Sequence, residues 1–110
     1  MSRDDPQVRL RHMLEYAKEA ISLMHNRTRA DLDTDRALGL AILRCVEIVG
    51  EAASRVPEPV QTSHPDIPWP EIIGMRNRLV HGYDLVDYDI VWSTIKQDLP
   101  ALVSELEKIL

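Results

Sequence analysis

The segment from about Thr34 or Asp35 to Arg55 is apolar on almost every side of the helix that its spacing predicts. A helix of this kind must be covered on most sides by other elements, because exposed apolar area is unfavourable in water. The segment therefore predicts a central helix with other helices packed around it. Its few polar groups fall at steps of three, four and three residues and form one narrow stripe, made of Arg44, Glu47, Glu51 and Ser54.

Two glycines lie inside this central helix, although glycine lowers helix stability. We expect another helix to pass close to Gly39 and to Gly50. Cys45 lies between Leu43 and Val46, so we interpret it as a core residue and not as a nucleophile.

Two further long helices are predicted, one before and one after the central helix in the sequence. The first begins with Asp5 as its cap and Pro6 at its first position. The last begins with Asp87 as its cap, and Pro100 is expected to kink it. Their apolar stripes recur at helical spacing and consist of Leu10, Met13, Leu14, Ala17, Ile21 and Met24 in the first, and Tyr88, Val91, Trp92, Ile95, Leu99, Leu102, Leu106 and Ile109 in the last.

The remaining segments are connections and one more helix. Residues 25–35 are polar and predict a connection with a short helical turn, and residues 56–70, with five of the seven prolines, predict a loop with one short turn near 58–64. The fourth helix is expected to enter through Pro68 or Pro70 and to end at Gly82. No segment alternates long enough to predict a strand. We therefore expect an all-α antiparallel bundle of four main helices plus one or two short ones, with residues 1–110 as a single domain.

Composition excludes several functions. Thirteen basic against eighteen acidic groups give a net charge of −5, so only a local patch could attract nucleic acid. The N-terminal segment lacks the apolar core of a signal peptide, and the longest apolar run near the middle, ALGLAIL, is far shorter than the roughly 20 residues that span a bilayer. The single cysteine forms no internal disulfide. We expect a soluble, cytoplasmic protein.

The sequence offers no metal-site or phosphate-loop pattern. The histidines never pair at a spacing of four residues, and none follows a glutamate by three. The four glycines are isolated, so no glycine-rich phosphate loop is present. We therefore expect no metal and no cofactor. The histidines are His12, His25, His64 and His81.

The stretch GMRNRLVHGYD, residues 74–84, contains the least expected residue of the chain. At helical spacing Arg76 lies in the middle of an apolar face that Ile72, Ile73, Leu79 and Val80 form. A buried guanidinium needs a partner, because an unpaired buried charge costs several kcal/mol. We expect this face to be the interface of a symmetric dimer.

The other polar groups of this stretch have ordinary structural explanations when taken singly. A histidine such as His81 suits the last turn of a helix, and Tyr83 after a terminal glycine often packs back on that turn. Arg76 lacks such an explanation, so the convergence of the three favours a site. Glu47 or Glu51 could hold a basic group of this helix in place, although a solvated edge with one helical ion pair explains them equally well.

An Arg, a His and a Tyr without a metal suit the cleavage of RNA, which carries its own nucleophile, the 2′-hydroxyl. A histidine can take the proton of that hydroxyl or protonate the leaving 5′-oxygen, and an arginine matches the phosphate. One chain supplies one such histidine. A two-fold axis would bring two copies of His81 and Arg76 into one cleft.

The chain resembles the HepT-like family of the HEPN superfamily of small α-helical domains. Arg76-Asn77-x-x-x-His81-x-Tyr83 matches the Arg-x4-His-x-Tyr signature of that family. The resemblance extends over nearly the whole chain, through RCVEIVGEAASRV (44–56), HPDIPWPEIIGMRNRLVHGYDLVDYDIVW (64–92) and DLP (98–100). It implies a homodimer and a metal-independent endoribonuclease, with Arg76 and His81 as the catalytic pair and Asn77 as their polar companion.

The resemblance also implies a partner. Such proteins act as toxins beside an antitoxin of the minimal nucleotidyltransferase type, which in this family transfers AMP onto the motif tyrosine, here Tyr83, and silences the toxin. The alternative is a non-catalytic module that binds nucleotide or serves as accessory subunit and substrate of such a nucleotidyltransferase. Growth arrest by the protein alone would favour the toxin.

Overall fold

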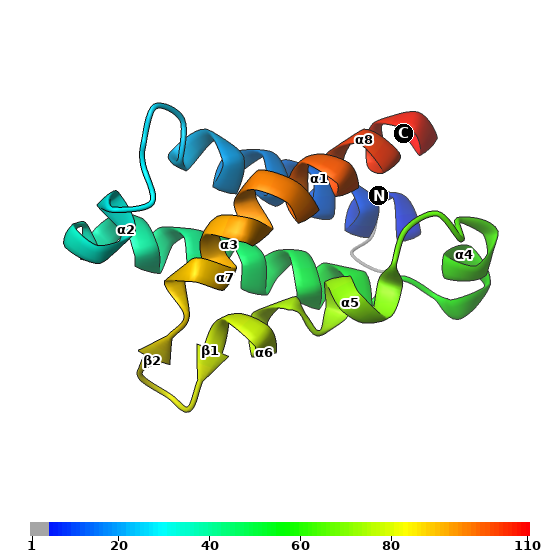
Figure 1. The fold of residues 1–110 in the computed structure, drawn as a ribbon. Helices are drawn as coiled ribbons and strands as arrows, with labels where there is room; N and C mark the ends of the chain where they lie inside the picture. Colours follow the sequence, from blue (N-terminus) through cyan, green and yellow to red (C-terminus); the bar gives the residue numbers. More distant parts are fainter. Residues whose placement is uncertain (1–4) are drawn as a thin grey trace.

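Two long helices, α1 (Pro6–Leu23) and α3 (Arg36–Ser54), run antiparallel and pack against each other in the computed structural model (Figure 1). The structure describes residues 5–110. The N-terminal segment, which we expect not to be a signal peptide, begins with residues 1–4, and these lie outside the described residues. The predicted cap at Asp5 is confirmed, and so is the predicted start of the central helix near Thr34 or Asp35. The Asp5 side chain accepts from the Gln7 N–H at 2.9 Å, and the Asp35 side chain accepts from the Leu38 N–H at 3.0 Å.

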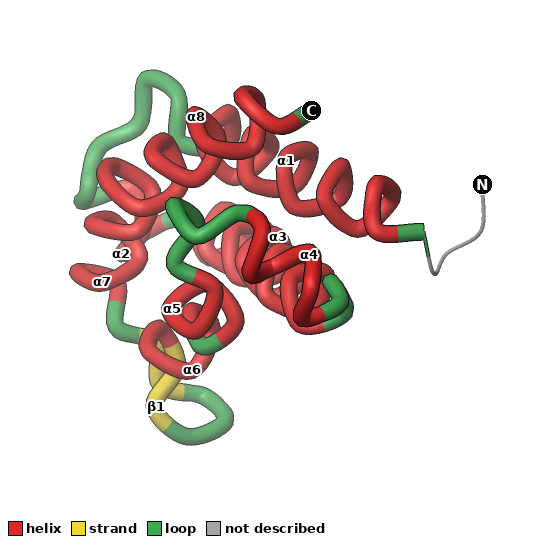
Figure 2. The backbone as a smooth tube through the Cα atoms, turned by 90° about the vertical axis from the view of Figure 1, so that its right-hand side faces the viewer, coloured by secondary structure: helices red, strands yellow, loops and turns green. Residues whose placement is uncertain are grey.

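The central position of α3 is confirmed. It packs against α1 on one side and against α5 (Trp69–Ile73) and α6 (Met75–Leu79) on the other. The tube in Figure 2 shows α3 between these layers. Its side chains account for a large part of the core, and Cys45 is buried among them. The buried residues of α3 are Leu38, Gly39, Ile42, Cys45, Val46, Val49, Gly50, Ala52 and Ala53.

The last helix is kinked, as the sequence predicts. It consists of α7 (Tyr88–Ser93), a π-helical turn η1 (Thr94–Asp98) and α8 (Leu99–Ile109). Pro100 has no N–H to bond the carbonyl four residues before it, and the Leu99 N–H bonds the carbonyl of Thr94, five residues back. The kink is therefore a π-turn. Beyond it α8 packs against α1 and crosses it obliquely in the view of Figure 1.

The two short helical turns that the sequence predicts are also present. They are α2 (Asp31–Thr34) and α4 (Glu58–Ser63). The proline-rich loop after α4 is closed by Trp69, whose indole N–H donates to the carbonyls of Gln61 at 3.0 Å and His64 at 3.1 Å. The predicted all-α antiparallel bundle is thus confirmed.

The prediction of one continuous helix up to Gly82 is wrong. The helix is divided at Gly74, whose backbone angles (φ −86°, ψ 1°) interrupt the regular turn between α5 and α6, and it ends at Leu79. Glycine is a weak helix former, and the β-branched Val80 that follows Leu79 takes an extended conformation (φ −119°, ψ 122°). His81 and Tyr83 therefore do not lie on or directly after a helix.

The expectation that the chain has no strand is also wrong. Residues Val80–His81 (β1) and Leu85–Val86 (β2) form a small antiparallel hairpin, in which Val80 pairs with Val86 and His81 with Leu85. Two-residue strands are too short for an alternating pattern to be visible in the sequence. The hairpin protrudes from the helices (Figures 1 and 2).

The turn and the base of this hairpin each depend on one backbone feature. Gly82 occupies the left-handed region (φ 77°), which other residues rarely adopt, and so permits the turn between the strands. At the base, the Asp87 N–H donates to the Leu79 carbonyl at 2.8 Å and joins the start of α7 to the end of α6.

The two glycines of α3 mark close approaches, as predicted, but of different kinds. A Cβ at Gly50 would lie 3.2 Å from the carbonyl oxygen of Ile73 and 3.3 Å from that of Ile72. A Cβ at Gly39 would meet the side chain of Tyr88, with its hydroxyl at 2.9 Å. Backbone carbonyls at the end of α5 cannot move without the helix, whereas the outer edge of a tyrosine ring can.

We therefore expect Gly50→Ala to lower the free energy of unfolding by about 1–3 kcal/mol, the usual cost of overpacking. Gly39→Ala should be close to neutral, because the helix-propensity gain of about 1 kcal/mol offsets a small movement of Tyr88. Urea denaturation of both variants measures the difference. Equal unfolding free energies for the two variants would contradict this account of the α3–α5 contact.

Candidate functional site

Arg76 lies in the first turn of α6 with its side chain exposed. Its guanidinium Nη1 lies 3.5 Å from Oδ1 of the adjacent Asn77 and donates to it. The premise that Arg76 sits on one buried apolar face is wrong for the protomer. Of the neighbours at helical spacing, only Ile72 and Leu79 are buried, and they pack into the protomer's own core.

His81 lies on β1, opposite Leu85. Its Nε2 is 3.8 Å from Oδ2 of Asp87, and 61% of its side chain is exposed. Tyr83, in the turn of the hairpin, is 97% exposed. All three motif side chains are thus accessible to a large substrate or to a partner protein.

The structure places these side chains in two different concave surfaces. The first, here called the arginine groove, has a volume of about 710 Å³ and contains both Arg76 and Tyr83. The second, here called the aspartate hollow, has a volume of about 420 Å³ and contains His81. Within one protomer, Arg76 and Tyr83 therefore line one concave surface and His81 lines a neighbouring one, and the two surfaces share Leu85, Val86 and Tyr88.

The arginine groove combines positive charge with apolar walls. Arg36 and Arg44 of α3 lie in it together with Arg76, against the two carboxylates of Glu47 and Asp84. The groove thus has three arginines against two carboxylates, on a chain whose net charge is −5. Its other lining residues are Leu40, Leu43, Val80, Tyr83, Leu85, Val86 and Tyr88.

The polar stripe of α3 forms helical ion pairs at the protein surface. Glu47 pairs with Arg44, and Glu51 pairs with Arg55 at 3.1 Å. Glu47 lies in the same groove as Arg76, but no ion pair between them is present in residues 5–110. Exposed pairs of this kind contribute little to stability.

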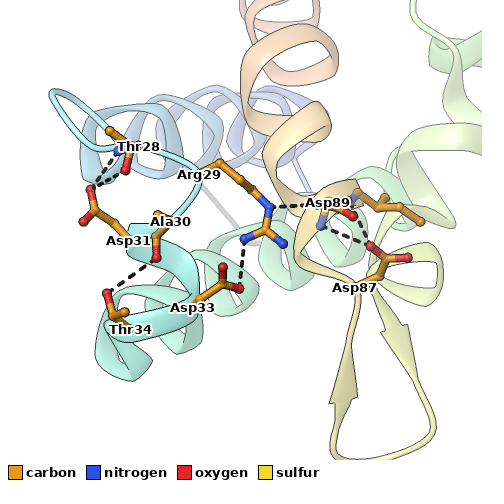
Figure 3. Close-up of polar contacts among 9 residues, drawn as sticks. Thr28, Arg29, Ala30, Asp31, Asp33, Thr34, Asp87 and Asp89 are labelled. Atoms are coloured by element: carbon orange, nitrogen blue, oxygen red, sulfur yellow. Dashed lines mark hydrogen bonds and ion pairs between the residues drawn. The ribbon is translucent and has the colours of Figure 1, made fainter.

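The aspartate hollow contains a network that the sequence analysis missed. The Arg29 side chain donates from Nε to Asp89 at 2.9 Å and from Nη1 to Asp33 at 3.0 Å (Figure 3). The hydrogen bonds with Asp33 and then with Asp89 raise the pKa of Arg29. Arg29 thus joins α2 to the first turn of α7, beside the hairpin. Its two partners are separated by 56 residues of sequence, so no local pattern indicates the contact.

Two other expectations concern nucleophiles and metals. Burial raises the pKa of the Cys45 thiol, which disfavours the reactive thiolate and agrees with its interpretation as a core residue. Over the described part of the chain, no three His, Cys, Asp or Glu side chains are grouped so that they could hold a metal ion. In the same range, no helix combines the length and the apolar character that crossing a membrane requires.

Comparison with known proteins identifies relatives along almost the whole chain. Residues 13–109 match the family described as "Ribonuclease HepT-like". A Methanocaldococcus jannaschii protein named "Putative RNase MJ1216" is 36% identical over 110 residues, which are all of this chain and 91% of that protein. A Thermococcus cleftensis protein named "Probable ribonuclease HepT" is 39% identical over 100 residues, covering 87% of this chain and 91% of that protein. No solved structure matches. The resemblance predicted from the Arg-x4-His-x-Tyr motif is therefore confirmed, and the chain belongs to the HepT-like ribonuclease family.

Proposed function

We propose that this protein is a metal-independent endoribonuclease in which His81 acts as general acid or base and Arg76 stabilises the reacting phosphate. The observation that carries the proposal is that both side chains are exposed and lie in one short segment, made of α6 and the hairpin after it. The chain that contains this segment belongs to the HepT-like ribonuclease family. Asn77 supports Arg76 through the contact between its Oδ1 and the guanidinium.

The proposed reaction needs only groups of the protein and the RNA. A neutral histidine takes the proton of the 2′-hydroxyl, and the 2′-oxygen attacks the adjacent phosphorus. The guanidinium pairs with the phosphate oxygens as charge builds on them. The bond from phosphorus to the 5′-oxygen then breaks, and a protonated histidine supplies a proton to that oxygen. The products are a 2′,3′-cyclic phosphate and a free 5′-hydroxyl.

A homodimer would supply the second histidine. Because Arg76 and His81 line different surfaces of one protomer, a two-fold axis beside the hairpin is the simplest way to bring an arginine and a histidine to the same phosphate. The face expected from helical spacing needs correction, since Ile72 and Leu79 are buried within the protomer. Leu40, Ile73 and Leu85 are the large apolar side chains exposed around Arg76, at 52%, 38% and 64%.

The proposed dimer predicts that light scattering at micromolar concentration returns about twice the 12.6 kDa of one chain. Leu40→Glu should yield monomers, because it places a charge at the apolar centre of the interface. Leu110→Glu is the matched control, since Leu110 is also exposed but lies at the C-terminus, away from the hairpin. A monomeric wild type would refute the dimer, and a dimeric Leu40→Glu would place the interface elsewhere.

The proposed chemistry predicts RNA cleavage that survives EDTA and leaves 2′,3′-cyclic phosphate ends. His81→Ala should reduce the rate about 10²–10⁴-fold, the usual contribution of general acid–base catalysis. Arg76→Lys should also be poor, because lysine lacks the planar fork that matches a phosphate.

The controls are His25→Ala and Arg78→Lys, which change exposed residues of the same types outside the arginine groove and the aspartate hollow. Both variants should cleave like the wild type. Cleavage that persists in highly purified His81→Ala would overturn the catalytic assignment. If the wild type cleaves no RNA but accepts AMP, the non-catalytic alternative holds.

We further propose that the protein is a toxin silenced by AMP on Tyr83. A partner nucleotidyltransferase would join the Tyr83 oxygen to the α-phosphorus of a nucleoside triphosphate, with loss of the phenol proton and release of pyrophosphate. Tyr83 is almost fully exposed and shares the arginine groove with Arg76, so an attached phosphodiester could pair with that guanidinium. The adenosine would occupy the same groove beside Leu40 and Leu43.

This switch predicts that co-expression with the cognate nucleotidyltransferase adds one adenylyl group to the intact protein and stops cleavage. Tyr83→Phe should gain no mass and should keep cleaving RNA, since the ring stays and only the acceptor oxygen is lost. Tyr88→Phe is the matched control, because Tyr88 lines the same groove and should leave the modification unchanged. If Tyr83→Phe still gains the adenylyl mass, the acceptor lies elsewhere.

A further inference from the structure

The two carboxylate oxygens of Asp87 face different partners. Oδ1 accepts from the backbone N–H groups of Asp89 and Ile90, both at 3.1 Å, and so caps α7 (Figure 3). Oδ2 lies 3.8 Å from Nε2 of His81. Capping explains the first oxygen. It does not account for the second, which faces the one motif histidine.

The position of Asp87 is fixed from three directions. Its own N–H donates to the carbonyl of Leu79 at 2.8 Å, and its Oδ1 is held by the cap. The first turn of α7 is in turn tied to α2 by Arg29, which bonds Asp89 (Figure 3). A carboxylate held in this way can orient a mobile neighbour, and His81 is such a neighbour because its side chain is 61% exposed.

The other carboxylates of the aspartate hollow have partners already. Asp33 and Asp89 both accept from Arg29. In residues 5–110, Asp87 is the one of the three that forms no ion pair with Arg29 and lies within 4.0 Å of His81. Its Oδ2 is therefore the acceptor in this hollow that the imidazole can reach.

We propose that Asp87 is the positioning residue of the ribonuclease site. Its Oδ2 accepts the Nε2–H of His81, which fixes the ring and leaves Nδ1 to exchange the proton with the RNA. This inference rests on the proposed function of His81. The separation of 3.8 Å exceeds a hydrogen bond, and a small rotation of the exposed imidazole closes it, with or without RNA.

Asp87→Asn separates this function from helix capping. Asparagine caps helices as well as aspartate does, so its Oδ1 keeps the two backbone bonds. Its amide group, however, presents N–H donors to His81 in place of an acceptor. The imidazole then turns its Nε2 lone pair to that amide and carries its proton on Nδ1, the wrong tautomer for catalysis, as happens in hydrolase triads with the same substitution.

The expected result for Asp87→Asn is a roughly 10²- to 10⁴-fold lower kcat, because the wrong tautomer removes general acid–base catalysis, with KM and the midpoint of thermal unfolding unchanged. Asp35→Asn is the matched control, because Asp35 also caps a helix, α3, through its Oδ1 but does not line the aspartate hollow that contains His81. A fall of kcat in Asp35→Asn as large as in Asp87→Asn would overturn the inference, since any cap substitution would then suffice.

Nitrogen NMR of His81 in the RNA-free protein supplies a readout that does not need activity. The neutral ring should carry its proton on Nε2 in the wild type and on Nδ1 in Asp87→Asn. Asp87→Ser, which also caps but lacks the second oxygen, serves if Asp87→Asn does not fold. If His81→Ala is inactive and Asp87→Asn cleaves at the wild-type rate, Asp87 has no such function and the proposed chemistry stands. If the wild type cleaves no RNA, the proposed function fails, and an unchanged tautomer would refute the contact separately.

Discussion

Burial of α3 is the constraint on which the rest of the structure depends. An almost wholly apolar helix must be covered on both sides, by α1 on one and by α5 and α6 on the other. The second contact is close, because Gly50 lets the last carbonyls of α5 approach the backbone of α3. The same packing fixes the position of α6. The burial of α3 therefore also determines where Arg76 lies.

The hairpin extends this constraint to His81 and Tyr83. Leu79 is buried in the core, and its carbonyl accepts from the Asp87 N–H, so the ends of the hairpin are held at the base while its turn is free in solvent. The pairing of Val80 with Val86 places β1 and β2 directly against each other. A rigid base and an exposed tip suit a segment that must present side chains to an RNA or to a modifying enzyme.

The sequence predicts those features of the fold that depend on residues close together in the chain. The caps Asp5 and Asp87, the start of α3 near Asp35 and the kink at Pro100 follow from local chemistry that any helix shares. The division at Gly74 and the hairpin could not be predicted in this way. Each helix and strand in this segment is only a few residues long, which is too short to produce a recognisable sequence pattern. The Arg29–Asp89 bond joins positions 60 residues apart, and no local pattern reports such a contact.

The same limit explains what the sequence could and could not say about the candidate site. The Arg-x4-His-x-Tyr spacing and the segments that flank it identified the family, but Arg76 was expected to be buried on the assumption that one helix continues through Val80. Because the chain becomes extended at Val80, His81 leaves the helix that carries Arg76 and lines the aspartate hollow, whereas Arg76 lines the arginine groove.

The separation of Arg76 and His81 within one protomer gives the proposed dimer a chemical reason. A phosphate in contact with Arg76 lies in the arginine groove, and no His81 of the same protomer lines that groove. Under the proposed dimer, the missing histidine comes from the second copy, and catalysis is coupled to assembly. Tyr83 lies on the Arg76 side of this junction, so an adenylyl group there would meet both the guanidinium and the incoming partner. One modification would then block substrate binding and the completion of the site together.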